Sequence, residues 1–446
     1  MRDSPASPGS TWYLRSCLEP PLEAAPLGAR ETAAIGIIGG GLAGLALALG
    51  LAERGVRAVL LEAATVGAGA SGRNGGLLSA GFTRGFADLR RRLGEADARE
   101  LFRLSHAAVG LVEHRIAQGS IACRPRHGVL EASWFDRPAA LEAEVDEQNR
   151  LFGRELCFWP RAQLRQLYRS ARYHDGIFDP QARHLDPLAL SRGYARLARA
   201  KGVRLFEESP VTRIERPGSG KGWRAVTRNG GVLEVDQLVL ATNAASPCLA
   251  PRLRRGLMPV NTYIIVTEPL SDTRDLPIRA GYAVYDDRFA TGYYRLLEDR
   301  ATGGRRLLWG GRIGLGAAPA DLARRLLADL AQVYPELKGV AVAYAWAGQM
   351  GFARHRMPVV APLAAGLWVT TGFAGHGLNT TTMAGELLAA ALADGSDEWR
   401  LLAPFGLAWS GGSLGPLAAQ ALYRGRALEE GVVAFWHRHR RRAPRR

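Results

Sequence analysis

Apolar residues are continuous along one segment near the N-terminus, residues 33–52, and this segment gives the first structural prediction. An uncharged run of this length is long enough to cross a membrane as a helix. Six of its residues are glycines, however, and glycine weakens a helix. A short buried strand at 33–38, a tight glycine turn and an apolar helix ending near Arg54 use the same residues without that cost. A second buried strand at 56–61 then completes a βαβ unit.

Further along the chain, the pattern of apolar residues becomes alternating or interrupted. Residues 262–266 and 293–297 alternate and predict antiparallel strands. Residues 81–185 combine a polar, arginine-rich helical stretch with short apolar runs that Pro and Gly interrupt. After Ala393 the chain is mostly apolar and rich in glycine. This last segment predicts a helical extension packed on the body of the protein, and a loosely ordered extension is the alternative.

The turn of the βαβ unit reads GGGLAG over residues 39–44 and contains the motif GxGxxG. In this motif, Gly39 allows a sharp turn, Gly41 lets the backbone approach a pyrophosphate, and Gly44 lets the helix pack on the strand. The N-terminus of the helix adds free N–H groups for an anion. Glu62, directly after the second strand, is placed to accept hydrogen bonds from a ribose. The unit predicts a dinucleotide cofactor, and a purely structural glycine turn is the alternative.

Composition is that of an ordinary globular protein with a strong excess of arginine. The chain has 446 residues, of which 47% are hydrophobic and 22% are charged, and this length allows two or three domains. The net charge of +16 comes almost entirely from arginine, because the chain has only three lysines. The arginines are spread along the chain apart from the terminal cluster HRHRRRAPRR. We interpret this cluster as a solvated tail, with a contact to phosphate or to a membrane surface as the alternative.

Cysteine usage and the N-terminal residues indicate the compartment. The cysteines Cys17, Cys123, Cys157 and Cys248 lie far apart, without the paired spacing of a zinc site or a disulfide framework. We therefore predict no metal and a reducing cytoplasm. The N-terminal residues contain proline and charges but no apolar run, so they do not predict a secretory signal.

The segment after Glu62 distinguishes between cofactors. Residues 65–76 read TVGAGASGRNGG, in which small residues and Arg73 occupy a stretch that should cross the pyrophosphate a second time. A flavin nucleotide needs this second crossing, whereas a nicotinamide nucleotide does not. Here the sequence resembles the D-amino-acid-oxidase superfamily of FAD-dependent oxidoreductases, and GASGRNGG is similar to its gamma-glutamylputrescine oxidase branch.

The resemblance runs from about residue 10 to residue 424 through motifs in the same order, among them SPVTRIE, LVLATN, PVNTYIIVTEPL, LWGGR and GFAGHGLN. It implies an α/β fold, with a Rossmann-like FAD-binding domain of the glutathione-reductase type and an inserted antiparallel-sheet substrate domain. We expect an N-terminal arm at 1–32 and FAD-binding segments at 33–80, 186–255 and 345–395. The substrate domain is expected at 81–185 and 256–344, and a C-terminal helical extension with a basic tail at 396–446.

The matching motifs also imply the residues that bind FAD. No cysteine lies in the C-terminal flavin loop, so FAD is expected to be held noncovalently. The expected FAD-binding residues are Gly39, Gly41, Leu42, Ala43, Gly44, Glu62, Ala63, Gly69, Ala70, Ser71, Arg73, Asn74, Gly75, Gly76, Val211, Ala241, Thr242, Asn243, Gly375, His376, Gly377, Leu378, Asn379 and Thr380.

Four residues are candidates for a role in catalysis. His376, on a loop flanked by glycines, is suited to support negative charge at the pyrimidine edge of a flavin, or simply to hold the turn. Arg295, with Arg312 as its competitor, is suited to a substrate carboxylate because a guanidinium group matches two oxygens. Either arginine is equally suited to a structural ion pair. Tyr294 is a candidate wall of the site, or a core residue.

Two positions depart from the sarcosine-oxidase type within the superfamily. The resemblance places Asn379 where those relatives have a lysine for the substrate carboxylate, and Leu308 where they have a lysine that assists oxygen reduction. The resulting prediction is oxidation of an amine or amino acid, gamma-glutamylputrescine-like or otherwise carboxylated. The imine product is hydrolysed, and O2 is reduced to H2O2. The alternatives are an FAD-dependent amino-acid dehydrogenase with another acceptor and a flavoprotein that acts on or binds tRNA.

Overall fold

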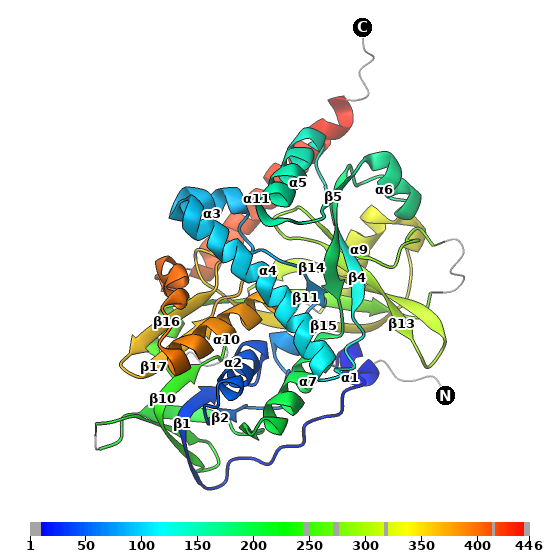
Figure 1. Cartoon of the computed structure of the whole chain (residues 1–446). Coiled ribbons are helices and arrows are strands. Elements are labelled where there is room, and N and C mark those ends of the chain that lie inside the picture. Colours follow the sequence, from blue (N-terminus) through cyan, green and yellow to red (C-terminus); the bar gives the residue numbers. More distant parts are fainter. Residues whose placement is uncertain are drawn as a thin grey trace.

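The computed structural model describes residues 10–218, 220–243, 249–270, 276–315, 320–412 and 415–440. The predictions made for residues 441–446 of the basic tail and for Cys248 lie outside these residues. Figure 1 shows two β-sheets, a group of helices packed against one of them, and a long C-terminal helix that runs along the molecule.

The first sheet carries the predicted βαβ unit. Its central strands run parallel, with β16 antiparallel at one edge, and β9 joins β10 antiparallel with β8 beside it. The strands, in spatial order, are β16 (Val359–Ala364), β17 (Leu367–Thr371), β10 (Val232–Leu240), β1 (Arg30–Ile38), β2 (Ala58–Leu61) and β7 (Arg204–Phe206), with β8 (Val211–Glu215) and β9 (Trp223–Thr227) alongside.

The second sheet is antiparallel except for one parallel pair, β12 with β4. Its strands, in spatial order, are β15 (Val342–Phe352), β11 (Met258–Thr267), β14 (Gly304–Gly314), β13 (Tyr293–Asp299), β12 (Ala283–Asp286), β4 (Arg126–Ala132), β6 (Gly176–His184) and β3 (Leu77–Leu78), with β5 (Cys157–Trp159) beside β6.

Helices cover one face of the first sheet and parts of the second. Helix α10 packs on α2 and α4, and α2 also packs on α7. The helices are α1 (Trp12–Ser16), α2 (Leu42–Glu53), α3 (Phe86–Leu93), α4 (Glu95–Gln118), α5 (Pro138–Phe152), α6 (Arg161–Leu167), α7 (Pro187–Ala200), α8 (Pro251–Gly256), α9 (Leu322–Val333), α10 (Gly377–Asp394) and α11 (Gly415–Arg440), with short 3₁₀ turns η1 (Ala70–Gly72), η2 (Pro335–Leu337) and η3 (Glu398–Phe405).

The first sheet is buried on both faces, which explains its continuous apolar strands. Because side chains alternate along a strand, Ala58 and Leu60 of β2 enter the core under the helices, while Val59 and Leu61 enter a second core on the opposite face. Helix α2 is buried on all sides between the sheet, α7 and α10, so its residues are apolar around the whole circumference.

The predicted α/β class and the βαβ unit are confirmed by this topology. The strands predicted at 262–266 and 293–297 are parts of β11 and β13, both antiparallel to β14. The domain division stays a prediction. Strand β15 spans the boundary expected near residue 345 and pairs with β11 of the second sheet, so the first sheet resumes only at β16.

The described residues after 396 include η3 and α11, and α11 is attached to the body along one side. Ala434 lies in the core of the second sheet, and the Glu430 Oε1 atom accepts a hydrogen bond from the backbone N–H of Phe289 at 2.6 Å. The opposite side of α11 exposes apolar side chains, including Leu417, Leu428 and Val432. None of the helices within the described residues is both long and apolar enough to cross a membrane.

One buried arginine lies where four helices beside the first sheet meet, namely α2, α4, α7 and α10. Arg115 of α4 is 0% exposed. Its Nη2 atom donates to Glu53 of α2 at 2.8 Å and to Glu386 of α10 at 3.2 Å, and its guanidinium lies 5.8 Å from the ring of Tyr194 on α7. Glu53 and Glu386 therefore share Arg115 at the place where these helices meet, and Glu386 also pairs with Arg54 at 2.6 Å.

Replacing Arg115 by methionine is expected to lower the free energy of unfolding by about 2 kcal/mol, because Glu53 loses its cation while Glu386 keeps its pair with Arg54. Arg99→Met is the matched control on the same helix, since Arg99 forms a half-exposed pair with Glu95 at 2.5 Å. The control should stay within about 0.5 kcal/mol of the wild type. Thermal unfolding measured by circular dichroism compares the two, and equal losses would contradict a special role for Arg115.

Candidate functional site

A large cavity of about 1900 Å³ is lined by residues of both sheets and of α11. Small-ligand sites usually occupy about 300–1,000 Å³, so this cavity has room for more than one small molecule. Its lining includes the glycine turn after β1, the segment around Arg73, the end of β10, the inner side of the second sheet and the loop before α10.

The cavity begins where three parallel strands of the first sheet end at the same level. Ile38 of β1 pairs with Leu61 of β2 and with Leu240 of β10. The residues that follow therefore share one edge of the sheet, and they are Gly39, Glu62 and Ala241. Ligands of parallel α/β sheets bind beyond this carboxyl edge.

Two glycines of the motif are required by close backbone approaches. Gly39 has a φ of +117°, and a Cβ atom there would lie 2.6 Å from the carbonyl oxygen of Ala241. A Cβ atom on Gly44 would lie 2.0 Å from the carbonyl oxygen of Gly39, so only glycine lets α2 pack so close to the turn. The motif thus closes the turn and directs the N-terminus of α2 to the cavity.

The N-terminus of α2 faces a polar side chain of the second crossing segment. The backbone N–H of Leu42 donates to Ser71 Oγ at 2.9 Å. A Cβ atom on Gly41 would lie 2.9 Å from the same oxygen, so this part of the glycine turn has no room for a side chain. Helix N-termini bearing free N–H groups are suited to phosphate.

Glu62 lies at the end of β2 and lines the cavity. Its Oε2 atom accepts the N–H of Gly40 at 2.6 Å, and its Oε1 atom accepts the N–H of Ala64 at 2.9 Å. Burial raises the pKa of Glu62 above its ordinary value. Each carboxylate oxygen keeps a further lone pair, so the group can accept hydrogen bonds from a sugar.

Arg73 contributes a positive charge to the cavity. Its Nε atom donates to the carbonyl oxygen of Ala68 at 2.8 Å, and its Nη1 atom donates to that of Ala347 at 3.4 Å. Within the described residues no carboxylate pairs with Arg73, and burial lowers its pKa. The Trp346 indole N–H donates to the carbonyl oxygen of Arg73 at 2.9 Å and fixes this segment against β15.

The loop before α10 is held by hydrogen bonds to the segment after β3. His376 Nε2 lies 3.2 Å from the carbonyl oxygen of Ser79, and Asn379 Nδ2 donates to that of Gly81 at 3.2 Å. Burial lowers the pKa of His376 below its ordinary value. The imidazole is therefore largely uncharged at neutral pH, and the positive end of the α10 dipole is the charge that this loop presents.

The structure does not bring Arg295 and Tyr294 to the cavity lining. Arg295 is 5% exposed, and its guanidinium donates to the carbonyl oxygens of Gly75 at 2.8 Å and Leu185 at 2.7 Å and to the hydroxyl of Tyr13 at 3.1 Å. These contacts occupy the guanidinium N–H groups that were expected to hold a substrate carboxylate.

Tyr294 points to the other face of the second sheet. Its ring stacks on Trp309 with 5.1 Å between centroids, and its hydroxyl lies 2.5 Å from that of Tyr334. Burial raises its pKa far above the ordinary value. Tyr294 is thus a core residue, whereas its neighbour Tyr293 lines the cavity.

Arg312 lines the cavity but its charge is matched. Its Nε and Nη2 atoms donate to the two carboxylate oxygens of Asp329 at 2.5 and 2.7 Å. This bidentate pair raises the pKa of Arg312. Arg312 therefore forms a structural ion pair, which was the alternative expected from the sequence, and its guanidinium group is not free to hold a substrate carboxylate.

Most of the expected FAD-binding residues meet around this one cavity. All of them line it except Gly44, which packs α2 on the turn, and Thr380, whose hydroxyl donates to the carbonyl oxygen of His376. The end of β10 is also tied to the second sheet, because Asn243 Nδ2 donates to the carbonyl oxygen of Gln349 and its Oδ1 atom accepts from the N–H of Gly351. The arrangement supplies a side-chain-free cradle, a helix N-terminus, an arginine and a carboxylate, which is a fitting donor set for a dinucleotide.

Sequence reasoning missed a group of polar residues on the other side of the cavity. Alternation along β4, with Val129 and Glu131 on the face opposite Leu130, was the pattern that pointed to an inward Glu131. The missed lining residues are Glu131, Glu144, Gln148, Tyr285, Asp287 and Tyr293.

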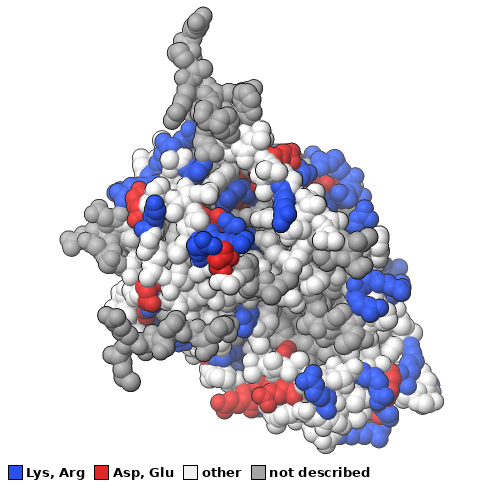
Figure 2. Space-filling model, turned by 180° about the vertical axis from the view of Figure 1, so that it is seen from behind, with Lys and Arg blue, Asp and Glu red and all other residues white. Residues whose placement is uncertain are grey.

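Charges on the molecular surface are mixed. On the face that Figure 2 shows, Lys and Arg lie in several separate groups among acidic and uncharged residues. The alternative that the protein binds tRNA stays a prediction. Among the residues that the structure describes, no group of three or more His, Cys, Asp and Glu side chains is arranged to hold a metal ion.

Comparisons with known proteins agree with this geometry. The family model "FAD dependent oxidoreductase" (DAO) matches residues 34–391. The chain is 34% identical over 359 residues to gamma-glutamylputrescine oxidoreductase from Escherichia coli, covering 79% of this chain and 82% of that protein. It is 32% identical over 381 residues to probable oxidoreductase OrdL from Haemophilus influenzae, covering 84% and 85%.

Solved structures show the same fold at lower identity. The structure of glycine oxidase from Geobacillus kaustophilus superposes with a TM-score of 0.67 at 22% identity, covering 84% of this chain and 98% of that one. Since the family model matches most of its length, the chain belongs to the DAO family of FAD dependent oxidoreductases, a family of amine and amino-acid oxidoreductases.

Proposed function

We propose that this chain uses noncovalently bound FAD to oxidise an amine, gamma-glutamylputrescine-like or otherwise carboxylated, with O2 as the electron acceptor. The observation that carries the proposal is the shared cavity, in which the glycine turn, Glu62 and Arg73 face the inner side of the second sheet. None of the three described cysteines, Cys17, Cys123 and Cys157, lines the cavity, which supports noncovalent binding. Their free thiols fit the cytoplasm as the compartment.

In this proposal the glycine turn and the N-terminus of α2 hold the pyrophosphate, and Glu62 accepts hydrogen bonds from the ribose. When bound, FAD supplies a two-electron oxidation of the carbon–nitrogen bond of the amine to an imine, which water converts to a carbonyl compound and ammonia or an amine. The loop with His376 and the N-terminus of α10 supports the flavin edge. The protein orients the amine and keeps it unprotonated, because only the neutral amine has a lone pair to release.

The carboxylate of such a substrate needs a cation other than Arg295 or Arg312. Arg356 lines the cavity, and its guanidinium lies 5.4 Å from the ring centroid of Phe289. Burial, with Arg84 as the next contribution, lowers the pKa of Arg356, so an anion bound there would relieve an unfavourable charge. We propose Arg356 as the carboxylate partner.

Oxygen reduction benefits from a positive charge beside the reduced flavin. Leu308 has no charge and is buried away from the cavity among Trp12, Tyr13 and Trp346. We propose that Arg73 supplies this charge, since it lines the cavity without a carboxylate partner among the described residues. A dehydrogenase that passes electrons to another acceptor is the outcome if oxygen reacts slowly.

The experiment that tests the proposed function is anaerobic mixing of the yellow holoenzyme with candidate substrates. The panel contains polyamines, their gamma-glutamyl conjugates, N-methyl glycines and D-amino acids. Bleaching of the flavin absorbance by one of these amines is expected. A protein that remains oxidised with every compound would overturn the proposal.

Glu62→Gln is expected to weaken FAD binding about tenfold or more, because charge-assisted hydrogen bonds to the ribose are lost. Glu207→Gln is the matched control. Glu207 is also buried and also accepts two backbone N–H groups, from Val66 at 2.7 Å and Ala24 at 3.1 Å, but it does not line the cavity. Fluorescence titration of the apoprotein with FAD gives the dissociation constants, and equal constants for the two variants would remove Glu62 from the site.

Arg73→Met is expected to slow reoxidation of the reduced enzyme by O2 about tenfold or more, because the charge acts in a site shielded from water. Arg73→Lys keeps the charge and should retain most of the rate. His376→Asn should change the rate less, because burial keeps the imidazole of His376 largely neutral. Stopped-flow absorbance follows the reaction. A wild-type rate no faster than that of free reduced flavin would make the protein a dehydrogenase.

A further inference from the structure

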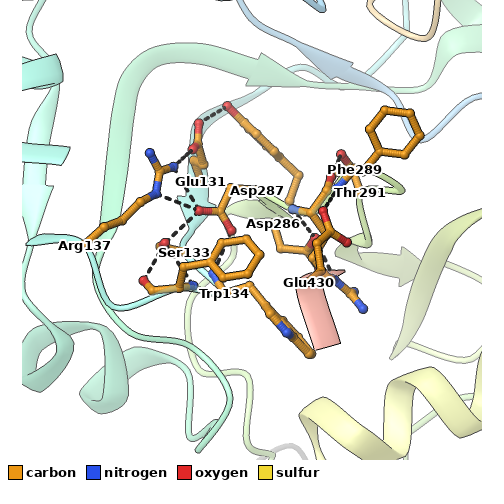
Figure 3. Close-up of polar contacts among 12 residues, drawn as sticks. Glu131, Ser133, Trp134, Arg137, Asp286, Asp287, Phe289, Thr291 and Glu430 are labelled. Atoms are coloured by element: carbon orange, nitrogen blue, oxygen red, sulfur yellow. Dashed lines mark hydrogen bonds and ion pairs between the residues drawn. The ribbon is translucent and has the colours of Figure 1, made fainter. Parts of the chain in front are cut away.

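Three carboxylates line one part of the cavity and none of them belongs to the glycine turn. Glu131 lies on β4, Glu144 on α5, and Asp287 directly after β12. Figure 3 shows Glu131 and Asp287 on the same side of the site, with Arg137 beside both. The group therefore belongs to the second sheet and the helix that covers it.

Arg137 is the cation of this group, and it is shared. Its Nε and Nη2 atoms donate to Asp287 Oδ2 at 3.1 and 2.9 Å, and Nη2 lies 3.5 Å from Glu131 Oε1. Asp287 also accepts the Ser133 hydroxyl at 2.7 Å and the N–H of Trp134 at 2.7 Å. Asp287 is thus fully used by the protein, and it fixes Arg137 rather than facing a ligand alone.

Glu131 and Glu144 are less completely paired. Glu131 Oε2 accepts the hydroxyl of Tyr285 at 2.9 Å, which leaves Oε1 with only the long contact to Arg137. For Glu144, the described residues provide no hydrogen bond and no ion pair. Arg137 is thus the one cation paired with these three carboxylates among the described residues, and when all three are ionised the group has an excess of two negative charges.

The neighbouring charged residues do not remove this excess, because they are paired among themselves. Arg154 forms an ion pair with Asp179. Arg288 forms a bidentate pair with Asp286 at 2.6 and 3.0 Å. Burial, with Glu144 and Asp287 as the next contributions, raises the pKa of Glu131 to about 7. Carboxylates so placed gain stability from a bound cation.

An independent observation points to the same place. Gln148 lies four residues after Glu144 on α5, hence on the same face of the helix, and it lines the cavity. It is 7% exposed, and its Oε1 atom is buried without a hydrogen-bond partner among the described residues. Buried carbonyl oxygens are normally bonded, so this acceptor is consistent with a donor that a ligand brings.

The acidic group is connected to the cofactor side by a row of cross-strand neighbours. Glu131 pairs in register with Tyr285, and Tyr285 pairs with Tyr293. A Cβ atom on Gly75, in the segment that crosses the predicted pyrophosphate site, would lie 2.6 Å from the Tyr293 ring. Two strand spacings of about 4.8 Å separate Tyr293 from Glu131, so the acidic group lies about 10 Å along the sheet from that contact.

We propose that Glu131, Glu144 and Gln148, backed by the Asp287–Arg137 pair, form a subsite for a second cationic group of the substrate, an ammonium or guanidinium distant from the amine that is oxidised. This inference rests on the proposed amine oxidation and narrows its substrate class to diamines, polyamines and their conjugates that keep a distal cation. An ammonium group brings three donors, which match the two carboxylates and the free amide oxygen.

The test compares straight-chain α,ω-diamines with ω-amino alcohols of the same length. Anaerobic stopped flow of the holoenzyme gives the ratio of the reduction rate constant to the dissociation constant for each compound. The diamine is expected to exceed its amino alcohol by about tenfold or more at the best length. Glu144→Gln should remove most of this preference through the diamine value and leave the amino-alcohol value nearly unchanged.

The control is Glu142→Gln, two residues earlier on α5, which is exposed as Glu144 is but lies outside the cavity lining, and which should leave the preference intact. An equal preference in wild type and Glu144→Gln, or no preference in the wild type, overturns the subsite. If no amine reduces the flavin, the proposed function fails, and calorimetric titration with 1,4-diaminobutane still decides the subsite. Binding that Glu144→Gln weakens supports it, and absent or unchanged binding rejects it.

Discussion

The site depends on the common end of three parallel strands. Because β1, β2 and β10 stop at the same level, a turn, a carboxylate and a third chain segment meet at one edge of the sheet. The turn closes only because Gly44 lets α2 come against the carbonyl oxygen of Gly39. A side chain at Gly44 would push the helix away, and with it the N-terminus that faces the cavity, while a side chain at Gly39 would collide with the carbonyl oxygen of Ala241. The register of the strands and the size of two residues thus determine where a cofactor can lie.

The parts of the fold that the sequence predicted are those fixed by local pattern. The βαβ unit at 33–61 consists of a continuous apolar run, a glycine turn and a second apolar run, so its prediction needs no information from distant parts of the chain. Strands β11 and β13 follow from alternation in the same way. The sheet to which β15 belongs could not be predicted from local pattern, because its partner β11 lies far away in the sequence. The expected boundary near residue 345 therefore falls inside that strand.

The residues expected from backbone motifs line the cavity, whereas side chains that had to be assigned to one face of a strand were placed less well, and the roles of both groups stay predictions. Tyr293 and Tyr294 are adjacent on β13, and successive residues of a strand point to opposite faces. The prediction chose the wrong residue of the two, because Tyr293 lines the cavity and Tyr294 lies in the core. Arg295 returns to the inner face, but the carbonyl oxygens of Gly75 and Leu185 and the hydroxyl of Tyr13 occupy it. The sequence shows the arginine but not the distant partners that use it.

Net charge is a poor guide to the chemistry of this cavity. A chain with a formal charge of +16 places its acidic excess at Glu131 and Glu144, while Arg73, which pairs with no carboxylate among the described residues, lies on the cofactor side. A molecule with two amines that spans the cavity therefore meets opposite charges at its ends. A positive charge disfavours the protonated form of a nearby amine, and oxidation requires the unprotonated form, whereas carboxylates favour protonation of the distant amine. The same separation of charge that would hold one nitrogen as a cation would release the lone pair of the other.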